Sequence, residues 1–285
     1  MIANGQNLSS DAGGRWQKQH WRVEEQAVAG DDLAVFRSLD AITRAPAEQV
    51  TLDRRSGVSR LSLAQTYYVK RFQGTGSRLK FCLGISRYQR ELRNLQYFTR
   101  LGLATPRLVA HGYESRAGLL QQAVLVTAEV TGAIDLEQFL AAGKLYEHGL
   151  ASARRLLAKL AEATRRLHAR GFYHKDLKTR NILVRQSAAR TELFFFDCPS
   201  GHHPPRMLLR RAIIRDLAHL EEGLRGHVRR VDLLYLYRQY RACKRLQPQD
   251  KDLLREVLAY PSKKRMTRKR RRREQSKRQL HRNAR

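Results

Sequence analysis

The chain has 285 residues, of which 42% are hydrophobic, so it is long and apolar enough to bury a substantial core. This excludes a wholly disordered protein, and ordinary counts of 18 glycines and 7 prolines exclude collagen-like and low-complexity scaffolds. The three cysteines, Cys82, Cys198 and Cys243, are too scattered for a disulfide framework, and no two have the CxxC spacing of a zinc site. We therefore expect a reducing, cytoplasmic compartment.

Positive charge dominates the composition, because 56 Lys and Arg against 26 Asp and Glu give a formal net charge of +30. Residues 263–285 hold 13 basic residues and one acidic residue, so this tail carries +12 and the rest of the chain +18. Both parts are expected to face a polyanion, and nucleic acid, an anionic membrane and a phosphorylated glycolipid all qualify. The tail has no aromatic residue, which argues against specific recognition of single strands.

The N-terminal half is predicted to be mostly β-structure. Residues 1–47 are interpreted as an arm, disordered up to about residue 15, with a helix over 16–40 packed on the first strands. β-Branched and aromatic residues between turn residues predict two or three antiparallel strands over 49–72. Apolar residues at helical spacing predict a helix over 87–101. Two short strands are predicted next, at 107–113 and 123–129.

The C-terminal half is predicted to be mostly helical. Its clearest helix covers 151–168, where apolar residues form one face and basic residues the other. Two short apolar runs, 182–184 and 193–196, predict a hairpin. Three further helices are predicted, at 207–222, 230–243 and 250–259. Strands first and helices later are typical of an α+β, two-lobed chain.

Neither a signal sequence nor a membrane span is predicted. The N-terminus is polar, without the apolar region of a secretory signal. The longest weakly polar stretch, 118–128, is far short of the roughly 20 residues that a transmembrane helix needs.

The segment LHARGFYHKDLKTRNILV, residues 167–184, carries the most informative chemistry. Asp176 and Asn181 lie five residues apart with Lys178 between them, and Asp197 follows the next apolar run. Phosphoryl transfer from ATP needs a carboxylate for the attacking hydroxyl, oxygen ligands for Mg²⁺ and a cation near the phosphate. The alternative is that these polar residues only cap a helix and a turn.

Two charged residues upstream support the same chemistry. Lys70 shares a strand face with Tyr68 and Phe72. Glu91 lies on the apolar stripe of the helix predicted next, where an unpaired carboxylate is costly. A buried lysine–glutamate pair and two semi-exposed surface charges are both open interpretations. Asp216 also lies on an apolar helix face, either as a buried group or as a surface carboxylate paired with a neighbouring arginine.

The motif HKDLKTRN at 174–181 resembles the catalytic loop of the protein-kinase-like superfamily. With YYVKRF at 67–72, RELRNLQYF at 90–98 and LGLATPRLVAHGYE at 101–114, the chain looks most similar to the bacterial lipopolysaccharide core kinases, over about residues 48–222. Those enzymes phosphorylate heptose or Kdo sugars on the cytoplasmic side of the inner membrane.

The resemblance implies an α+β, two-lobed protein-kinase-like fold, with a small antiparallel-sheet N-lobe over 48–130 and a mainly helical C-lobe over 131–260. A basic, disordered tail over 261–285 would come after them. ATP and Mg²⁺ are the implied cofactors, and Asp216 would anchor the backbone of the catalytic loop. The implied site residues are Asp176 and Lys178 for catalysis, Asn181 and Asp197 for Mg²⁺, and Lys70, Glu91, Glu129 and Val130 for the nucleotide.

The sequence departs from the kinase pattern in two places. No GxGxxG lies between the first two predicted strands, where 54–60 has one glycine and three arginines, and the Gly-Thr-Gly at 74–76 is interpreted as a flexible connection. Asp197 is followed by Cys-Pro instead of Phe-Gly, and the next helix is predicted only about ten residues later. Little room remains for a segment that docks peptides, which favours a small or sugar hydroxyl as acceptor.

The resulting hypothesis is an ATP-dependent kinase for a sugar hydroxyl of the lipopolysaccharide inner core or a related glycolipid. It would be cytoplasmic or peripheral at the inner face of the inner membrane, with the basic tail on the anionic membrane surface. Two alternatives stay open: a protein or small-molecule kinase, and an inactive kinase-like module that binds nucleic acid or membrane. The adjacent His202 and His203 are interpreted as loop residues and not as metal ligands.

Overall fold

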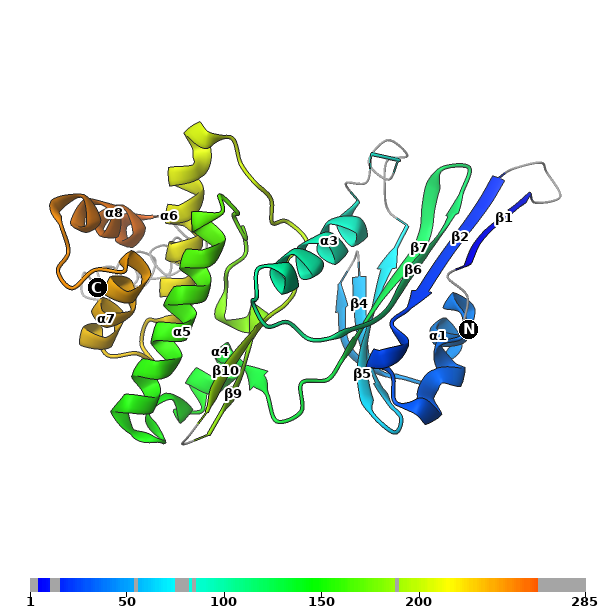
Figure 1. The fold of residues 1–285 in the computed structure, drawn as a ribbon, viewed down its shortest axis with the longest axis horizontal. Coiled ribbons are helices and arrows are strands. Elements are labelled where there is room, and N and C mark those ends of the chain that lie inside the picture. The colour runs from blue at the N-terminus through cyan, green and yellow to red at the C-terminus, as the bar shows by residue number, and fades with distance from the viewer. Residues whose placement is uncertain are drawn as a thin grey trace, which may run out of the picture. The chain divides into compact units, whose positions relative to one another are not determined.

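The computed structural model describes residues 5–10, 16–53, 56–74, 82–83, 86–187 and 190–260. The chain divides into two compact units (Figure 1). The sheet unit comprises Met1–Leu136 and Asn181–Gly201, and the helical unit comprises Glu137–Arg180 and His202–Arg285. The predicted basic tail lies outside the described residues, as do Arg54, Arg55 and the last two residues of Gly-Thr-Gly at 74–76.

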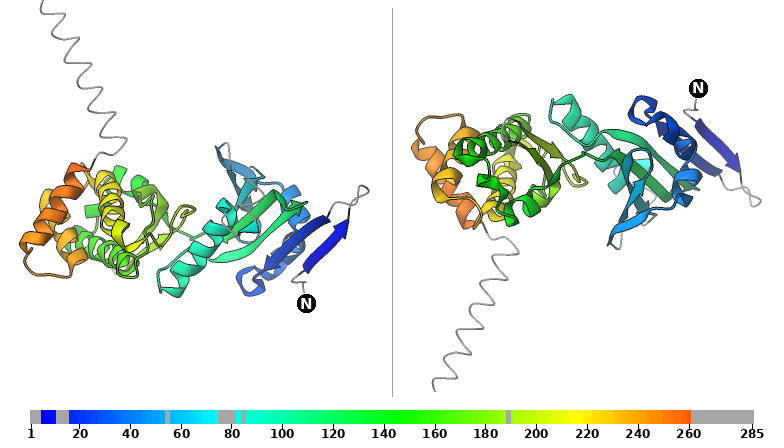
Figure 2. Two further views of the ribbon diagram at one scale, coloured as in Figure 1. Left: turned by 90° about the horizontal axis from the view of Figure 1, so that it is seen from above. Right: turned by 90° about the horizontal axis from the view of Figure 1, so that it is seen from below.

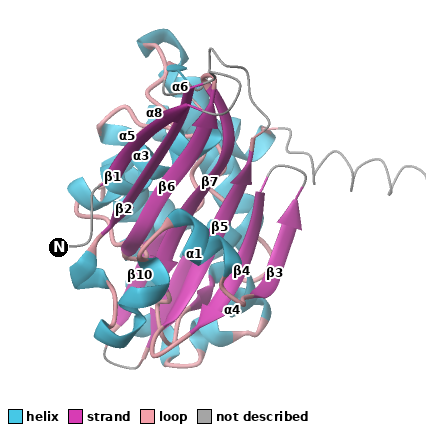
Figure 3. Cartoon of the chain, turned by 90° about the vertical axis from the view of Figure 1, so that its right-hand side faces the viewer, coloured by secondary structure: helices cyan, strands magenta, loops and turns pink. Residues whose placement is uncertain are grey.

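A seven-stranded antiparallel sheet forms the centre of the sheet unit, and Figure 3 shows its strands in the order β1-β2-β6-β7-β5-β4-β3. The strands predicted over 49–72 are confirmed as three antiparallel strands, and the two predicted next are confirmed but longer. The strands are β1 (Gly5–Ser10), β2 (Trp16–Val23), β3 (Glu48–Asp53), β4 (Ser56–Ser62), β5 (Thr66–Gln73), β6 (Leu108–Arg116) and β7 (Leu119–Ala128).

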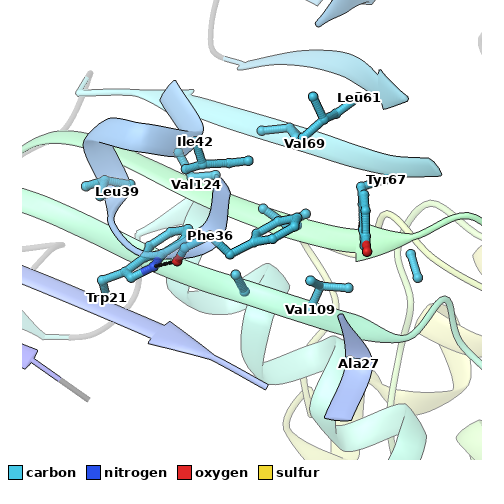
Figure 4. Packing of buried hydrophobic residues seen from close by; sticks show 13 residues of the cluster. Trp21, Ala27, Phe36, Leu39, Ile42, Leu61, Tyr67, Val69, Val109 and Val124 are labelled. Atoms are coloured by element: carbon cyan, nitrogen blue, oxygen red, sulfur yellow. Dashed lines mark hydrogen bonds between the residues drawn. The ribbon is translucent and has the colours of Figure 1, made fainter. Parts of the chain in front are cut away.

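The two faces of this sheet are covered by different layers, because neighbouring residues of a strand point to opposite faces. Val124 and Val126 of β7 join a core with the short helix α1 (Leu39–Arg44). The alternate residues Ala123 and Leu125 join a second cluster, with residues of α3 (Arg87–Arg100). Figure 4 shows the first core. Its fully or almost fully buried side chains include Trp21, Phe36, Leu39, Ile42, Tyr67, Val69 and Val109.

The disorder predicted up to about residue 15 is wrong for residues 5–10, which form β1 and pair with β2. Residues 16–47 are part of the sheet unit and not a separate arm, and the helix predicted over 16–40 is wrong. They form β2, the 3₁₀ turns η1 (Glu25–Ala27) and η2 (Gly30–Phe36), and α1. The indole N–H of Trp21 donates a 2.7 Å hydrogen bond to the carbonyl of Phe36, which ties β2 to η2 (Figure 4). Burial of this aromatic pair stabilises a segment that the polar sequence around it does not mark as structured.

Glycine permits β2 to lie against β6. Gly112 of β6 pairs with Trp21, and a Cβ atom there would lie only 2.3 Å from the carbonyl oxygen of His20. Any larger residue at this position would push the two strands apart.

The rest of the sheet unit contains α3 and a small second sheet. The side chain of Ser86 accepts from the Gln89 N–H in a capping box, which fixes the start of the predicted helix. The predicted hairpin is confirmed, but by its contacts it belongs to the sheet unit and not to a continuous C-terminal region from residue 131. This second sheet has the order β10-β9-β8 and consists of β8 (Ile134–Asp135), β9 (Ile182–Gln186) and β10 (Thr191–Phe195).

Helices make up the helical unit, and Figure 2 shows them in the colours from green to orange. The helix α5 packs against α7, and α6 packs against α8. All four helices predicted for this half are confirmed. No helix in the described part of the chain combines the length and the apolar character that crossing a membrane requires. The helices are α4 (Leu136–Ala141), α5 (Gly149–Ala169), α6 (Arg206–Leu224), α7 (Arg230–Arg241) and α8 (Pro248–Ala259).

Candidate active site

Lys70 is the centre of an ion triad in the sheet unit. Its Nζ lies 2.6 Å from Oε1 of Glu91 and 2.6 Å from Oδ1 of Asp197. Strand alternation turns Lys70 to the face of β5 opposite Val69, and Glu91 lies in the second turn of α3, only 4% exposed. The structure therefore forms a largely buried pair, with Glu91 buried and 13% of the Lys70 side chain exposed, and not two surface charges.

Burial and charge act in opposite directions on this triad. Burial alone lowers the pKa of Lys70, but the carboxylates of Glu91 and Asp197 outweigh it, so the pKa is raised. Burial raises the pKa of Glu91, Lys70 opposes this shift and Asp197 adds to it. Lys70 is therefore cationic at neutral pH and is available to any negative group that replaces Asp197 as its second partner.

Asn181 and Asp197 present oxygen donors on two linked backbone segments. The turn η4 (Thr179–Asn181) leads into β9, and the Asn181 carbonyl accepts a 3.2 Å hydrogen bond from the Phe196 N–H. Asp197 has a left-handed backbone (φ 53°), which L-residues rarely adopt.

The donor chemistry of Asn181 and Asp197 fits Mg²⁺. Amide and carboxylate oxygens are hard ligands, and Mg²⁺ in nucleotide sites commonly takes one or two protein ligands together with phosphate oxygens and water. Among the described residues, no group of three or more His, Cys, Asp or Glu side chains could hold a metal by itself. One amide and one carboxylate oxygen thus fit a Mg²⁺ that also binds phosphate oxygens of a nucleotide.

Asp216 of α6 holds the predicted catalytic loop, residues 174–181, at its start in the helical unit. Its fully buried carboxylate accepts hydrogen bonds from the backbone N–H groups of His174 (2.7 Å) and Lys175 (2.9 Å). Lys175 is left-handed (φ 69°), a conformation that persists only where its surroundings hold it. The predicted anchor is confirmed, and the surface carboxylate is not.

A second contact of α6 supports the loop on the other side of Asp176. Thr179 is 2% exposed, and a Cβ atom at Gly223 would lie 2.6 Å from its Oγ1. Gly223 is seven residues after Asp216, two turns along the same face of α6. The helix therefore touches the loop both before and after Asp176.

Asp176 itself is accessible and lies among cations. Its side chain is 33% exposed and forms an ion pair with Lys178, and Arg180 lies 4.0 Å away. A carboxylate in this setting can be reached by a ligand. The two residues predicted for catalysis are thus in direct contact with each other.

Glu129 and Val130 follow β7 and retain some unused backbone groups. The Glu129 N–H donates to the Thr66 carbonyl (2.9 Å), its carboxylate accepts from the Tyr68 hydroxyl (3.2 Å), and the Val130 carbonyl accepts from the Ala133 N–H (3.0 Å). Within the described part of the chain, the Glu129 carbonyl and the Val130 N–H form no hydrogen bond. Because these two groups belong to one trans peptide they point in opposite directions, so only one of them can face a given base.

Sequence reasoning did not single out Asn94, which lies on α3 one turn after Glu91. Its side-chain amide donates to the carbonyls of Cys198 (2.6 Å) and Gly201 (3.0 Å), and it is 8% exposed. The signal in the sequence was an amide on the apolar stripe of an amphipathic helix, three residues from a carboxylate that stood out on the same stripe.

Comparisons with known proteins add the family. Residues 42–240 match the lipopolysaccharide kinase (Kdo/WaaP) family, whereas no curated individual protein matches significantly. Among solved structures, the chain is similar to WaaP in complex with acyl carrier protein, with a TM-score of 0.62 and 19% sequence identity over 84% of this chain and 95% of that chain. This similarity confirms the predicted α+β kinase-like fold, an antiparallel-sheet region followed by a helical region. The chain belongs to the lipopolysaccharide kinase (Kdo/WaaP) family.

Proposed function

We propose that this kinase transfers the γ-phosphate of ATP to a sugar hydroxyl, heptose or Kdo, of the lipopolysaccharide inner core or a related glycolipid. The observation that carries the proposal is the Lys70 triad, in which one largely buried cation, with 13% of its side chain exposed, contacts two carboxylates at 2.6 Å. Such a costly arrangement has no evident use in a scaffold, and it suits a cation that must be kept in place for phosphate oxygens. Family membership supports the reaction class.

The sheet unit would bind the nucleotide. Lys70 would contact the α and β phosphates while Glu91 holds its ammonium in place, and either the Glu129 carbonyl or the Val130 N–H would face the adenine. Mg²⁺ would neutralise charge on the phosphate oxygens, and Asn181 and Asp197 would hold it. In this arrangement the phosphates take over the contact that Asp197 makes with Lys70, which leaves the Asp197 carboxylate for the metal.

The catalytic loop of the helical unit would serve the acceptor. The acceptor oxygen forms a bond to the γ-phosphorus, the bond from that phosphorus to the bridging oxygen breaks, ADP leaves, and the hydroxyl proton goes to Asp176. Lys178 would contact the γ-phosphate, so its ammonium, which now pairs with Asp176, would then lie between that carboxylate and the phosphate.

A sugar acceptor is favoured over a protein by the short segment after Asp197. Eight residues separate it from the start of α6 at Arg206, and Asn94 binds two of their carbonyls. A peptide would find little backbone there to pair with.

Basic charge supports an acidic partner. The net charge of +30 suits acidic sugars at an anionic bilayer, where each basic residue near the surface contributes about 1 kcal/mol. We propose contact with the inner face of the membrane through the basic tail. Since WaaP was solved in complex with acyl carrier protein, an acyl carrier protein is a second candidate partner, to be tested by co-elution.

The test is phosphate transfer from γ-labelled ATP with Mg²⁺, with dephosphorylated lipopolysaccharide core and a general protein substrate offered side by side. We expect label on the core, lost in Asp176→Ala while ATP binding persists. Asp252→Ala is the matched control, since this aspartate of α8 is exposed and pairs with Arg255 one turn away. Label on protein alone would support the protein-kinase alternative. No label on either substrate despite ATP binding would direct the test to other small acceptors first and to the inactive module only after them. Unchanged turnover in Asp176→Ala would contradict the assigned base.

A further inference from the structure

The segment after Asp197 is fastened to α3 by the side chain of Asn94. The amide nitrogen of Asn94 donates to the carbonyls of both Cys198 and Gly201 and also lies 3.9 Å from the Cys198 sulfur. Both Asn94 and Cys198 are buried, at 8% and 3% exposure. The contact joins a helix to a loop about a hundred residues further along the chain, entirely within the sheet unit.

The backbone of Asp197 needs such fastening on both sides. Its left-handed conformation (φ 53°) is uncommon for a residue with a Cβ atom, although aspartate adopts it more readily than most, so contacts on either side help to hold it. On its N-terminal side, the N–H groups of Phe195 and Phe196 donate to the carbonyls of Ala104 (2.9 Å) and Asn181 (3.2 Å). On its C-terminal side, the Asn94 amide donates to the carbonyl of the next residue, Cys198 (2.6 Å).

The chemistry of this position suits an asparagine. A primary amide carries two N–H groups on one nitrogen, so it can serve two carbonyls at once, whereas a carboxylate of the same shape can serve none. Pro199 lies between the two acceptor residues and has no N–H, so this short segment is limited in the backbone hydrogen bonds that it can make for itself.

We propose that Asn94 is a positioning residue that holds Asp197 in its left-handed conformation and so fixes the direction of its carboxylate. Glu91 and Asn94 lie three residues apart on one face of α3, and both act on Asp197. Glu91 acts through Lys70 on the carboxylate, and Asn94 acts on the backbone. Any displacement of α3 would therefore move both supports of Asp197 together. The inference rests on the proposed function in one respect, the use of Asp197 as a Mg²⁺ ligand.

Cys198 supplies a readout that does not depend on turnover. We compare Asn94→Leu, which keeps the volume but removes both donors, with Asn94→Ser, a milder change in case the first variant does not fold. Tyr88→Phe is the matched control, because it removes a buried polar contact of the same helix, the 3.2 Å contact with His111, without touching the segment after Asp197.

The first measurement is the alkylation rate of Cys198 by iodoacetamide, monitored by peptide mass spectrometry on the full chain without nucleotide. One lost hydrogen bond shifts a local opening equilibrium by about tenfold, so we expect at least about tenfold faster alkylation in Asn94→Leu and a smaller increase in Asn94→Ser. The rate in Tyr88→Phe should equal the wild-type rate. Alkylation at the wild-type rate in both Asn94 variants would overturn the proposal.

The second measurement is ATP affinity with Mg²⁺ and with EDTA. We expect the gain in affinity that Mg²⁺ gives to fall in Asn94→Leu, while affinity in EDTA is unchanged. Equal losses in Mg²⁺ and in EDTA, or the same losses in Tyr88→Phe, would indicate a merely structural role and overturn the proposal. The variant Asp197→Asn distinguishes a failure of the proposed function from a failure of this inference. If it leaves the gain in ATP affinity from Mg²⁺ intact, Asp197 is not the metal ligand of the proposed function, and the alkylation rates still decide whether Asn94 fastens the segment.

Discussion

Replacing Lys70 with methionine separates the charge of the triad from its packing. The side chains are of similar length, so Lys70→Met keeps the apolar contacts and leaves two carboxylates without their cation. Glu91 is 4% exposed, whereas the side chain of Asp197 is 33% exposed and can be solvated. Removing one partner of a buried ion pair costs about 3–5 kcal/mol, and since only Glu91 is stranded we expect the free energy of unfolding to fall by about 3 kcal/mol at pH 8.

The loss should depend on pH with a definite sign. Burial already raises the pKa of Glu91 in the folded chain, and the variant removes Lys70, which opposes that shift. A carboxyl group whose folded pKa lies above its unfolded value costs nothing when it is protonated in both states. The cost grows as the pH rises from the unfolded pKa through the folded pKa and is then constant. The difference between wild type and variant should therefore be larger at pH 8 than at pH 5.

Denaturant unfolding at pH 5 and pH 8 measures these differences. Adding Glu91→Gln to Lys70→Met removes the stranded charge and should recover stability at pH 8. Arg255→Met is the control, because Arg255 contacts Asp252 at 2.5 Å with both side chains exposed, and such surface pairs contribute about 0–1 kcal/mol. A loss in Lys70→Met that is no larger than the control, or one that Glu91→Gln fails to reduce, would refute the account of the triad.

Three further changes test the supports of the site and of the sheet. Asp216→Asn keeps the shape of the side chain but places an NH₂ group against one of the two backbone N–H donors. We expect the free energy of unfolding to fall by about 1–3 kcal/mol and kcat to fall more than ATP affinity, and an unchanged kcat would contradict the anchoring role. Gly223→Ala introduces a Cβ atom 2.6 Å from Thr179 Oγ1. Denaturation should show a fall of about 1–3 kcal/mol in the free energy of unfolding, which adding Thr179→Ala partly reverses, and losses that simply add in the double variant would argue against the contact. Gly112→Ala places a Cβ atom 2.5 Å from Cε3 of Trp21 and should weaken the pairing of β2 with β6. We expect the free energy of unfolding to fall by about 1–3 kcal/mol and the tryptophan fluorescence to change, and wild-type values for both would refute the close approach.

Local pattern predicted most helices and strands, because their periodicity is a property of consecutive residues. The N-terminal segment was the exception. β2 has few apolar residues, and its stability comes from pairing with β6, about ninety residues later, and from burial of Trp21 beneath η2. Such long-range partners have no trace in the local sequence. The same reason explains why Asn181–Gly201 was expected with the C-terminal helices, although its contacts place it in the sheet unit.

The site residues that could be predicted are those whose charge is unexpected on an apolar helix face. Glu91 and Asp216 each stood out as a carboxylate on an apolar helix face, a position that is costly without a partner, and both have one. Asn94 lies on the same face as Glu91 but carries no charge, so it raised no comparable conflict. Its acceptors are backbone carbonyls, which have no sequence signature at all. Sequence reasoning thus finds buried charges more readily than the neutral side chains that hold a backbone.

Acidic and basic side chains are distributed differently between the interior and the surface of the molecule. Five acidic residues are buried, whereas no lysine or arginine in the described part of the chain is buried to that degree. Lys70, the partner of Glu91, is 13% exposed, but fully buried Asp232 accepts from Arg154 and Arg229, whose side chains are 44% and 51% exposed. Carboxylates are therefore used for internal support while guanidinium groups remain outside, so the surface is more basic in character than the composition alone conveys. An excess of exposed cations attracts polyanions over several ångströms without defining their chemistry. In the proposed reaction, charge would bring an acidic acceptor to the protein, and selection among acceptors would depend on the residues around Asp176.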